Sequence, residues 1–255
     1  MLWHRVWLET RWRFLIGLII LVCSAGGSVL AYPKVMALLP LVPSMQDGGE
    51  LGRRIQEAAQ LARSYRGYIW SQWYRQMPVQ MGTLFAALLG TGGLLSQSIG
   101  GGTLFTLSLP VSRARLLAAR TGAGLAELAV LAFVPSLMIP LLSPAVGQSY
   151  GIADVLVHGV CLFVVGCVFY SLAILLSTVF GDVWRPLLLA CAAGFVLALV
   201  DLLSPARSTF SLFSVMNAER WFRAGQLPWA GLLVSVLASA AMLQAAAVNY
   251  ARKDF

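Results

Sequence analysis

Six long apolar segments, separated by shorter polar ones, organise the whole chain. They cover residues 14–32, 79–97, 116–142, 155–180, 186–204 and 229–248. Each approaches or exceeds the ~20 residues with which an α-helix crosses ~30 Å of hydrocarbon. The apolar runs are continuous rather than alternating, which argues against a β-barrel. The pattern therefore predicts an all-α membrane protein with six transmembrane helices in a single transmembrane domain, residues 1–255.

Two further helices are predicted outside the spans. In residues 1–13, Arg5, Glu9 and Arg13 form a polar stripe at i,i+4 spacing beside several tryptophans. This composition is typical of an interfacial helix in the headgroup region. Residues 33–78 are expected to form an external loop, whose amphipathic helix lies on the outer leaflet or on a neighbouring subunit. The apolar face of that helix recurs every three or four residues and consists of Leu51, Ile55, Ala58, Ala62, Tyr65, Ile69 and Trp73.

Composition and charge narrow the classes of function. The chain is 59% hydrophobic and only 11% charged, which is typical of a membrane protein rather than a soluble domain. Its net charge of +8 comes mainly from arginines beside apolar segments, which favours membrane lipids over nucleic acid as the partner. Short basic loops stay in the cytoplasm. Because residues 98–115 form such a loop and the number of spans is even, we expect both termini inside a bacterial cytoplasmic (inner) membrane.

Motifs for catalysis and for cofactors are missing from the sequence. No Gly-x-x-x-x-Gly-Lys-Ser/Thr motif occurs, and the only histidines are His4 and His158. The four cysteines lie in apolar segments at no metal-binding spacing. We therefore expect a chain that is not an enzyme and carries no cofactor of its own.

The aromatic loop 205–228 is expected to be external and could dip back into the membrane under cover of protein.

Segment 98–115 is the main candidate for a functional site. It is basic and able to form a helix, and its apolar side chains have no bilayer of their own to occupy. A groove on a partner protein would cover them, although an ordinary loop that only sets the topology is the alternative. The residues that would contact the partner are Thr103, Leu104, Phe105, Leu109, Pro110, Val111, Ser112 and Arg113.

The same segment resembles a loop of a known family. Residues 102–104 (Gly-Thr-Leu), 109–113 (Leu-Pro-Val-Ser-Arg) and 116–120 (Leu-Leu-Ala-Ala-Arg) resemble the first cytoplasmic loop of type-2 ABC exporter (ABC-2 type) permeases. The plan of an interfacial N-terminal helix, six spans and a membrane-dipping element before the last span is similar too. The acidic residue that precedes Gly-Thr-Leu in the family is absent, because residues 97–101 read Gln-Ser-Ile-Gly-Gly.

The resemblance implies a permease subunit that dimerises with a second copy or a homologous permease. Two cytoplasmic ATPase subunits would bind ATP and Mg²⁺ and act on segment 98–115 as a coupling helix. Trp184 and Arg185 in the second inner loop would be lesser contacts, or would only anchor the chain at the membrane surface. A rival interpretation is a non-transporting membrane anchor or assembly protein that holds a soluble partner on its basic loop.

Polar and small residues inside the spans supply further candidates. Glu127 lies about 16 Å into its span at 1.5 Å per residue, near the expected midplane, where a carboxylate is costly. It is either a cavity or gating residue or a hydrogen-bonded structural acid, and Asp201 lies nearer the outer end of its span. The small residues at four-residue spacing, Ala190, Gly194 and Ala198, form a candidate dimer contact, with packing inside one subunit as the alternative.

Overall fold

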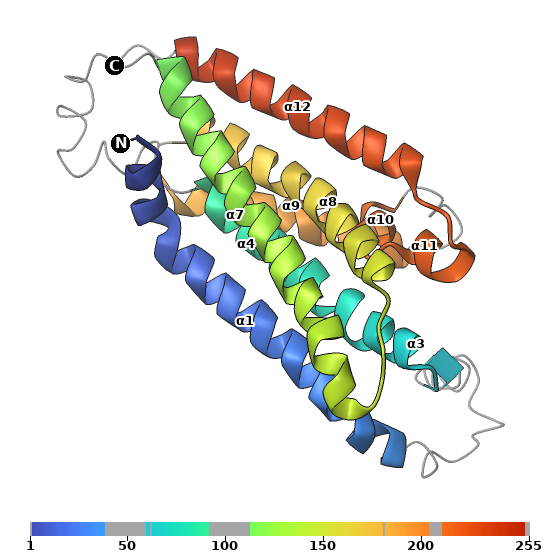
Figure 1. Ribbon diagram of the computed structural model, residues 1–255. Coiled ribbons are helices and arrows are strands. Elements are labelled where there is room, and N and C mark those ends of the chain that lie inside the picture. Colours follow the sequence, from blue (N-terminus) through green and yellow to red (C-terminus); the bar gives the residue numbers. More distant parts are fainter. Residues whose placement is uncertain are drawn as a thin grey trace.

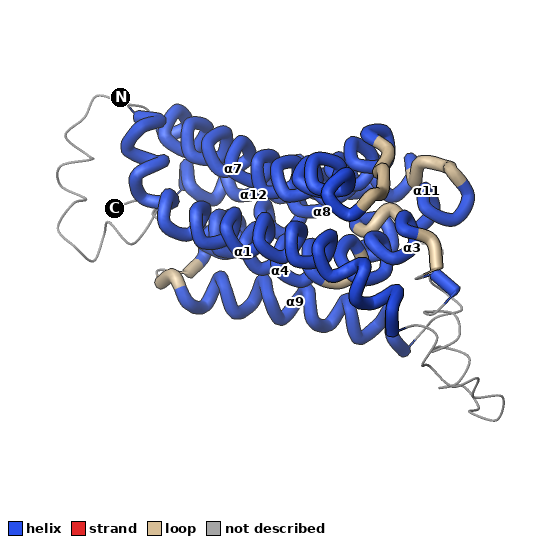
Figure 2. Tube along the Cα trace, turned by 60° about the horizontal axis from the view of Figure 1, so that its bottom comes forward, coloured by secondary structure: helices blue, strands red, loops and turns tan. Residues whose placement is uncertain are grey.

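The protein is a bundle of long helices (Figure 1). The computed structural model describes residues 2–38, 60–61, 63–91, 113–180, 182–203 and 211–252, which contain helices and turns but no strand (Figure 2). Within these ranges, five helices are long and apolar enough to cross a membrane. They are α1 (Leu2–Leu38), α7 (Arg113–Leu142), α8 (Ile152–Val179), α9 (Trp184–Leu203) and α12 (Trp229–Arg252). The predicted all-helical membrane fold is confirmed at this level.

The segment predicted as the second span contains the shorter helix α4. Helix α4 runs from Met77 to Thr91, which is 15 residues, or about 22 Å. The rest of the predicted span, residues 92–97, lies outside the described residues. The described part alone is therefore too short to cross a bilayer, and a total of six spans stays a prediction.

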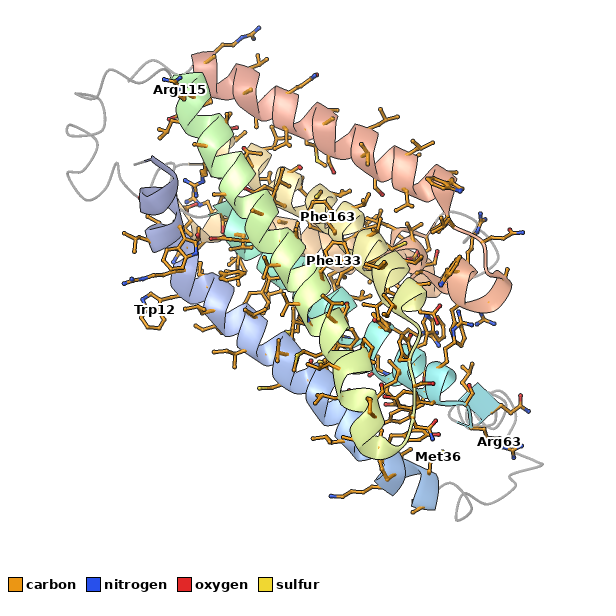
Figure 3. The ribbon with its side chains drawn as sticks, viewed as in Figure 1. Trp12, Met36, Arg63, Arg115, Phe133 and Phe163 are labelled. Atoms are coloured by element: carbon orange, nitrogen blue, oxygen red, sulfur yellow. The ribbon has the colours of Figure 1, made fainter. Side chains whose placement is uncertain are left out.

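The N-terminal helix and the first span form one element. The sequence predicts a separate interfacial helix over residues 1–13, whereas α1 continues without interruption from Leu2 to Leu38. No glycine or proline occurs before Gly17, so nothing in the sequence breaks the helix at residue 13. Trp12 points away from the bundle (Figure 3), in keeping with its exposed fraction of 65%.

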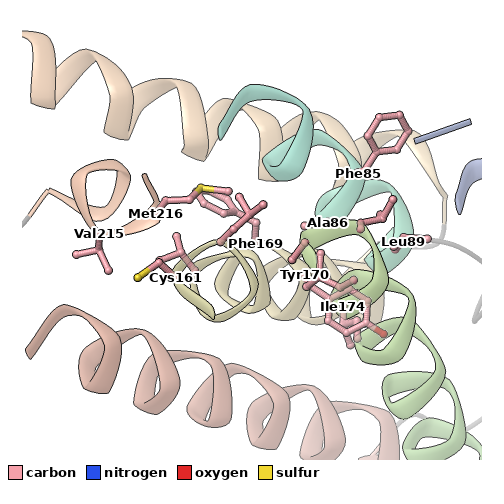
Figure 4. Packing of buried hydrophobic residues seen from close by; sticks show 14 of the residues in the cluster. Phe85, Ala86, Leu89, Cys161, Phe169, Tyr170, Ile174, Val215 and Met216 are labelled. Atoms are coloured by element: carbon pink, nitrogen blue, oxygen red, sulfur yellow. The ribbon is translucent and has the colours of Figure 1, made fainter. Parts of the chain in front are cut away.

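Helix α8 occupies the centre of the bundle and packs against α4, α7, α9 and α12. Figure 4 shows Phe85 and Leu89 of α4 in one cluster with Phe169 and Ile174 of α8. The helices approach closely because α4 carries small residues on this side: a Cβ atom at Gly90 would lie 2.7 Å from the Tyr170 carbonyl oxygen. The small residues on this side of α4 therefore pack inside the chain.

Aromatic side chains hold the segment before α4 in the bundle. Helix α3 (Tyr65–Ile69) leads into the π-helix η2 (Trp70–Tyr74), in which the Arg75 amide donates to the Trp70 carbonyl over 2.9 Å. The sequence predicts that the apolar face of this segment covers the outer leaflet or a neighbouring subunit. In the described part, that face is buried against the chain's own helices α1 and α7 and the start of α8. The predicted residues before 60 lie outside the described part.

The segment before α12 turns back onto the bundle. It contains α10 (Leu212–Met216) and α11 (Glu219–Ala224). Val215 and Met216 are buried in the same cluster as Cys161 of α8 (Figure 4). Cys161 lies nine residues from the start of α8, or about 14 Å along it. The described part of the loop therefore reaches well into the bundle and is covered by protein there.

Candidate functional site

The candidate site lies at the end of the bundle where segment 92–112 joins the helices. Helix α4 ends there and α7 begins there, together with the start of α1 and the end of α12 (Figure 1). The predicted contact residues 103–112 lie outside the described residues, as does the side chain of Arg113 at the start of α7. Trp184, 71% exposed, and Arg185, paired with Asp182 over 3.1 Å, begin α9 at this same end.

A group of polar residues, of which Thr10, Arg120 and Glu127 are buried, lies next to this junction, between α1 and α7. The Thr10 hydroxyl donates to Oε1 of Glu127 over 2.5 Å, although the two residues are 117 positions apart. Thr10 and Glu127 are each only 5% exposed. Oε2 of Glu127 is buried and has no hydrogen-bond partner among the described residues. We call this group the α1–α7 polar cluster; its members are Glu9, Thr10, Arg13, Arg120 and Glu127.

Arg120 brings the opposite charge into the α1–α7 polar cluster. It precedes Glu127 by two helical turns on α7, and its side chain is buried. Electrostatic interactions connect it with Glu127 and, across the helix interface, with Glu9 of α1. Glu9 is exposed and Arg13 is half-buried, so these two balance the buried Arg120 and Glu127 from the edge of the cluster, which lowers the cost of holding charges there.

The cluster also connects α1 with α4. Nη1 of Arg13 donates to the backbone carbonyl of Leu88 over 3.2 Å, in the last turn of α4. On α7, the hydroxyl of Tyr170 from α8 lies within 3.3 Å of the Arg120 carbonyl oxygen. The helices that flank segment 92–112 are thus joined by polar bonds to α1 and α8.

The partner of Glu127 gives a second measure of the depth of this carboxyl. Thr10 precedes the apolar run 14–32 by four residues. Measured along α1, the carboxyl therefore lies near the start of the apolar run, whereas measured along α7 it lies eleven residues past Leu116. The register of the two helices is consistent at the other end, where Gly26 approaches Leu142. A position near the midplane of the membrane stays a prediction.

A second polar group holds the opposite end together. Oδ1 of Asp154 accepts hydrogen bonds from Nη2 of Arg66 over 2.8 Å and from Nε1 of Trp221 over 2.7 Å. Nδ1 of His158 lies 2.7 Å from the Asp154 backbone carbonyl oxygen rather than its carboxylate. These contacts join α3, α8 and α11. The group therefore has a structural role: it holds the loop segments at this end onto α8.

A groove runs between α4 and α9 from the α11 end of the bundle. It contains two adjoining cavities of about 740 and 530 Å³ that share Arg75, Val79, Ala198 and Phe213. The larger cavity lies under α10 and α11 and has charged walls. The smaller one lies deeper between α4 and α9 and has mainly apolar walls. We call the two together the α4–α9 groove.

Several of the predicted residues of α9 lie at this groove. Asp201 lines the larger cavity, and its carboxylate accepts a hydrogen bond from the hydroxyl of Ser211. Ala190, Gly194 and Ala198 all line the smaller cavity, and Ala190, 1% exposed at its floor, also packs in one cluster with Ala87 and Ala173. The structure therefore separates Asp201 from Glu127, which lies at the other end of the bundle.

Comparison with known proteins gives no relative for this chain. The sequence matches no protein-family model, and neither curated proteins nor solved structures give a significant match.

Proposed function

We propose that this chain is the membrane-spanning permease subunit of an ABC-2 type exporter. In this proposal it crosses a bacterial inner membrane six times, keeps both termini in the cytoplasm, and dimerises. Two ATPase subunits, which bind ATP and Mg²⁺, dock on segment 98–115 with Trp184 and Arg185 nearby. The observation that carries the proposal is the pair of bonds from α1 to the helices flanking that segment, Thr10 to α7 and Arg13 to α4.

These bonds supply a mechanism for coupling. A force applied to segment 92–112 acts on the end of α4 and the start of α7 together, and α1 is tied to both. ATP can shift the bundle between two states only if the contacts differ between them. Glu127, with one oxygen bonded and the other without a partner among the residues that the structure describes, is the residue that we propose changes partners during the cycle.

Site-specific crosslinking tests whether an ATPase docks on the basic segment. A photo-crosslinking residue at Phe105 should form an adduct with a protein that carries the Gly-x-x-x-x-Gly-Lys-Ser/Thr motif. The same residue at Gln148, exposed at the opposite end of the bundle, is the matched control and should form none. Absence of an ATPase adduct at Phe105, or equal adducts at both positions, would exclude the docking.

A second experiment distinguishes an exporter from a membrane anchor. In the complex reconstituted in vesicles, thiol labelling of Ala198→Cys in α9 should change when ATP is added. Arg113→Glu and Phe105→Pro should abolish that change, whereas Lys34→Glu, an exposed charge reversal at the other end of α1, should preserve it. A complex that binds ATP but labels identically with and without it is an anchor.

A further inference from the structure

The α4–α9 groove combines a charged mouth with an apolar floor. Its larger cavity is lined by Arg75, Arg220 and Arg223 and by the acids Asp201 and Glu219. Glu219 is already paired with Arg223 over 2.8 Å, and Asp201 is bonded to Ser211. Positive charge therefore exceeds the negative charge at the mouth of the groove.

Arg75 is the clearest candidate for an anion contact. It is exposed, and its guanidinium lies 5.8 Å from the centre of the Trp70 ring. Within the described ranges of the chain, it forms no ion pair. A guanidinium of this kind can donate two parallel hydrogen bonds to a phosphate group.

The depth of the groove matches one leaflet of a bilayer. Asp201 lines the mouth and Ala190 the floor, so the groove follows α9 for eleven residues, or about 16 Å. This is about half of the ~30 Å hydrocarbon thickness. The arginines lie near the outer ends of α9 and α4, where lipid headgroups are expected if these helices cross the membrane.

The groove is also open along the side that would face lipid. Beyond Gly194, α9 has little protein around it: Phe195, which lines the deeper cavity, is 69% exposed, and Val196 on another face is 55% exposed. An acyl chain could enter sideways between α4 and α9 without crossing a polar barrier. The deeper cavity, about 530 Å³, is in the ~300–1,000 Å³ range of ligand sites.

We propose that the α4–α9 groove binds one phospholipid with an anionic headgroup, taken from the leaflet next to α11. Its phosphate contacts Arg75 and Arg220, and an acyl chain lies along Val79, Gly194 and Phe195. This site depends on α9 crossing the membrane and not on transport or on an ATPase. Failure of the exporter proposal would leave it standing.

The test is lipid-dependent thermal stability of the purified protein in detergent. Phosphatidylglycerol and phosphatidylcholine with identical acyl chains are titrated, with soluble glycerol phosphate as the headgroup alone. We expect phosphatidylglycerol to bind about ten-fold more tightly than phosphatidylcholine. Equal effects of the two lipids would overturn the proposal, and so would full stabilisation by glycerol phosphate, because the site would then hold a free anion.

Two pairs of variants test the two parts of the groove. Arg75→Gln should weaken phosphatidylglycerol binding about ten-fold, whereas Arg185→Gln at the opposite end of α9 should not. Ala198→Trp should fill the groove and abolish binding, whereas Val196→Trp, outside both cavities, should leave it intact. Native mass spectrometry of each variant gives the retained lipid directly, so a loss of stability alone cannot imitate the result. If Ala198→Trp dissociates a dimer and leaves lipid retention unchanged, a second copy fills the groove and the lipid proposal is wrong.

Discussion

At the scale of single residues, Gly124 is where α7 tolerates no side chain against α8. A Cβ atom there would overlap the hydroxyl of Tyr170, and the ring carbons Cζ and Cε2 would lie 2.6 and 2.7 Å away. Tyr170 is 1% exposed and cannot swing aside. We expect Gly124→Ala to lower the free energy of unfolding by about 1–3 kcal/mol through overpacking.

The matched control for this change is Gly27→Ala in α1. A Cβ atom at Gly27 meets no atom of the described residues within 4 Å, so alanine should be tolerated or slightly stabilising through its helix propensity. Thermal unfolding of both variants in the same detergent is the measurement. Equal midpoints for the two would contradict the close packing of α7 on Tyr170.

Thr10 is the second residue whose role can be isolated. Its hydroxyl provides the hydrogen bond to the buried Glu127 carboxyl. Thr10→Val keeps the shape of the side chain but leaves the carboxyl without that donor, at a cost of about 1–3 kcal/mol. Thr10→Ser retains the donor and should unfold at nearly the wild-type temperature. A Thr10→Val protein as stable as Thr10→Ser would mean that the bond contributes nothing.

At the scale of elements, α3 and η2 are held by tyrosines that differ in their hydrogen bonds. The Tyr65 hydroxyl lies 2.7 Å from Oγ of Ser143, whereas the Tyr150 hydroxyl is buried with no partner in the described part of the chain. We expect Tyr65→Phe to cost about 1 kcal/mol and Tyr150→Phe to be neutral or stabilising. Thermal unfolding near pH 7 compares the two.

The same pair of tyrosines predicts sensitivity to alkali. Burial raises the pKa of Tyr65 and of Tyr150 above the ordinary value of about 10. Because the unfolded chain loses these protons first, stability is retained below about pH 10 and falls as the pH rises above it. Tyr150→Phe should reduce that fall, and an unchanged slope between pH 9 and 11 would contradict the burial of its hydroxyl.

At the scale of the whole molecule, the described connections between helices lie at the two opposite ends of the bundle, and the start of α1 and the end of α12 lie at the same end (Figure 1). The connection from η3 to α8, which contains Gln148, lies at the α3 end, and the turn from α8 to α9, which contains Val183, lies at the end where α7 begins (Figure 1). In a variant without native cysteines, Gln148→Cys should react with an impermeant thiol reagent in intact cells, whereas Val183→Cys should react only after lysis. The reverse pattern would invert the orientation predicted from the basic segments.

Much of this architecture could be predicted from the sequence, because long apolar segments are a strong signal of membrane helices. The spans of α7, α8, α9 and α12 agree with the predicted segments within a few residues at most ends. The continuity of α1 and the internal burial of Tyr65 and Trp73 were not predicted, because an amphipathic pattern does not say what covers the apolar face.

The candidate sites depend on contacts that no local pattern reveals. Glu127 was identified as a candidate from its position in an apolar segment, but its bond to Thr10 joins residues 117 positions apart. Arg75 and Arg220 line one groove only because α10 folds back onto α8 and α11 packs on η2, where the Phe222 ring stacks on Trp70. The i,i+4 spacing of Glu9 and Arg13 can be read from the sequence. This spacing does not show whether the side chains contact lipid headgroups or neighbouring helices.

Because of the π-helix η2, the position of the preceding residues depends more on the number of residues in this segment than on their identity. The i→i+5 bonds of η2, such as the one from the Arg75 amide to the Trp70 carbonyl, place one more residue in the turn than an α-helix would. Deleting one residue such as Gln72 would restore α-helical register and rotate everything before it by about 100°. Tyr65 would then turn away from Ser143. Among related chains, this stretch should therefore accept substitutions at exposed positions far more readily than insertions or deletions.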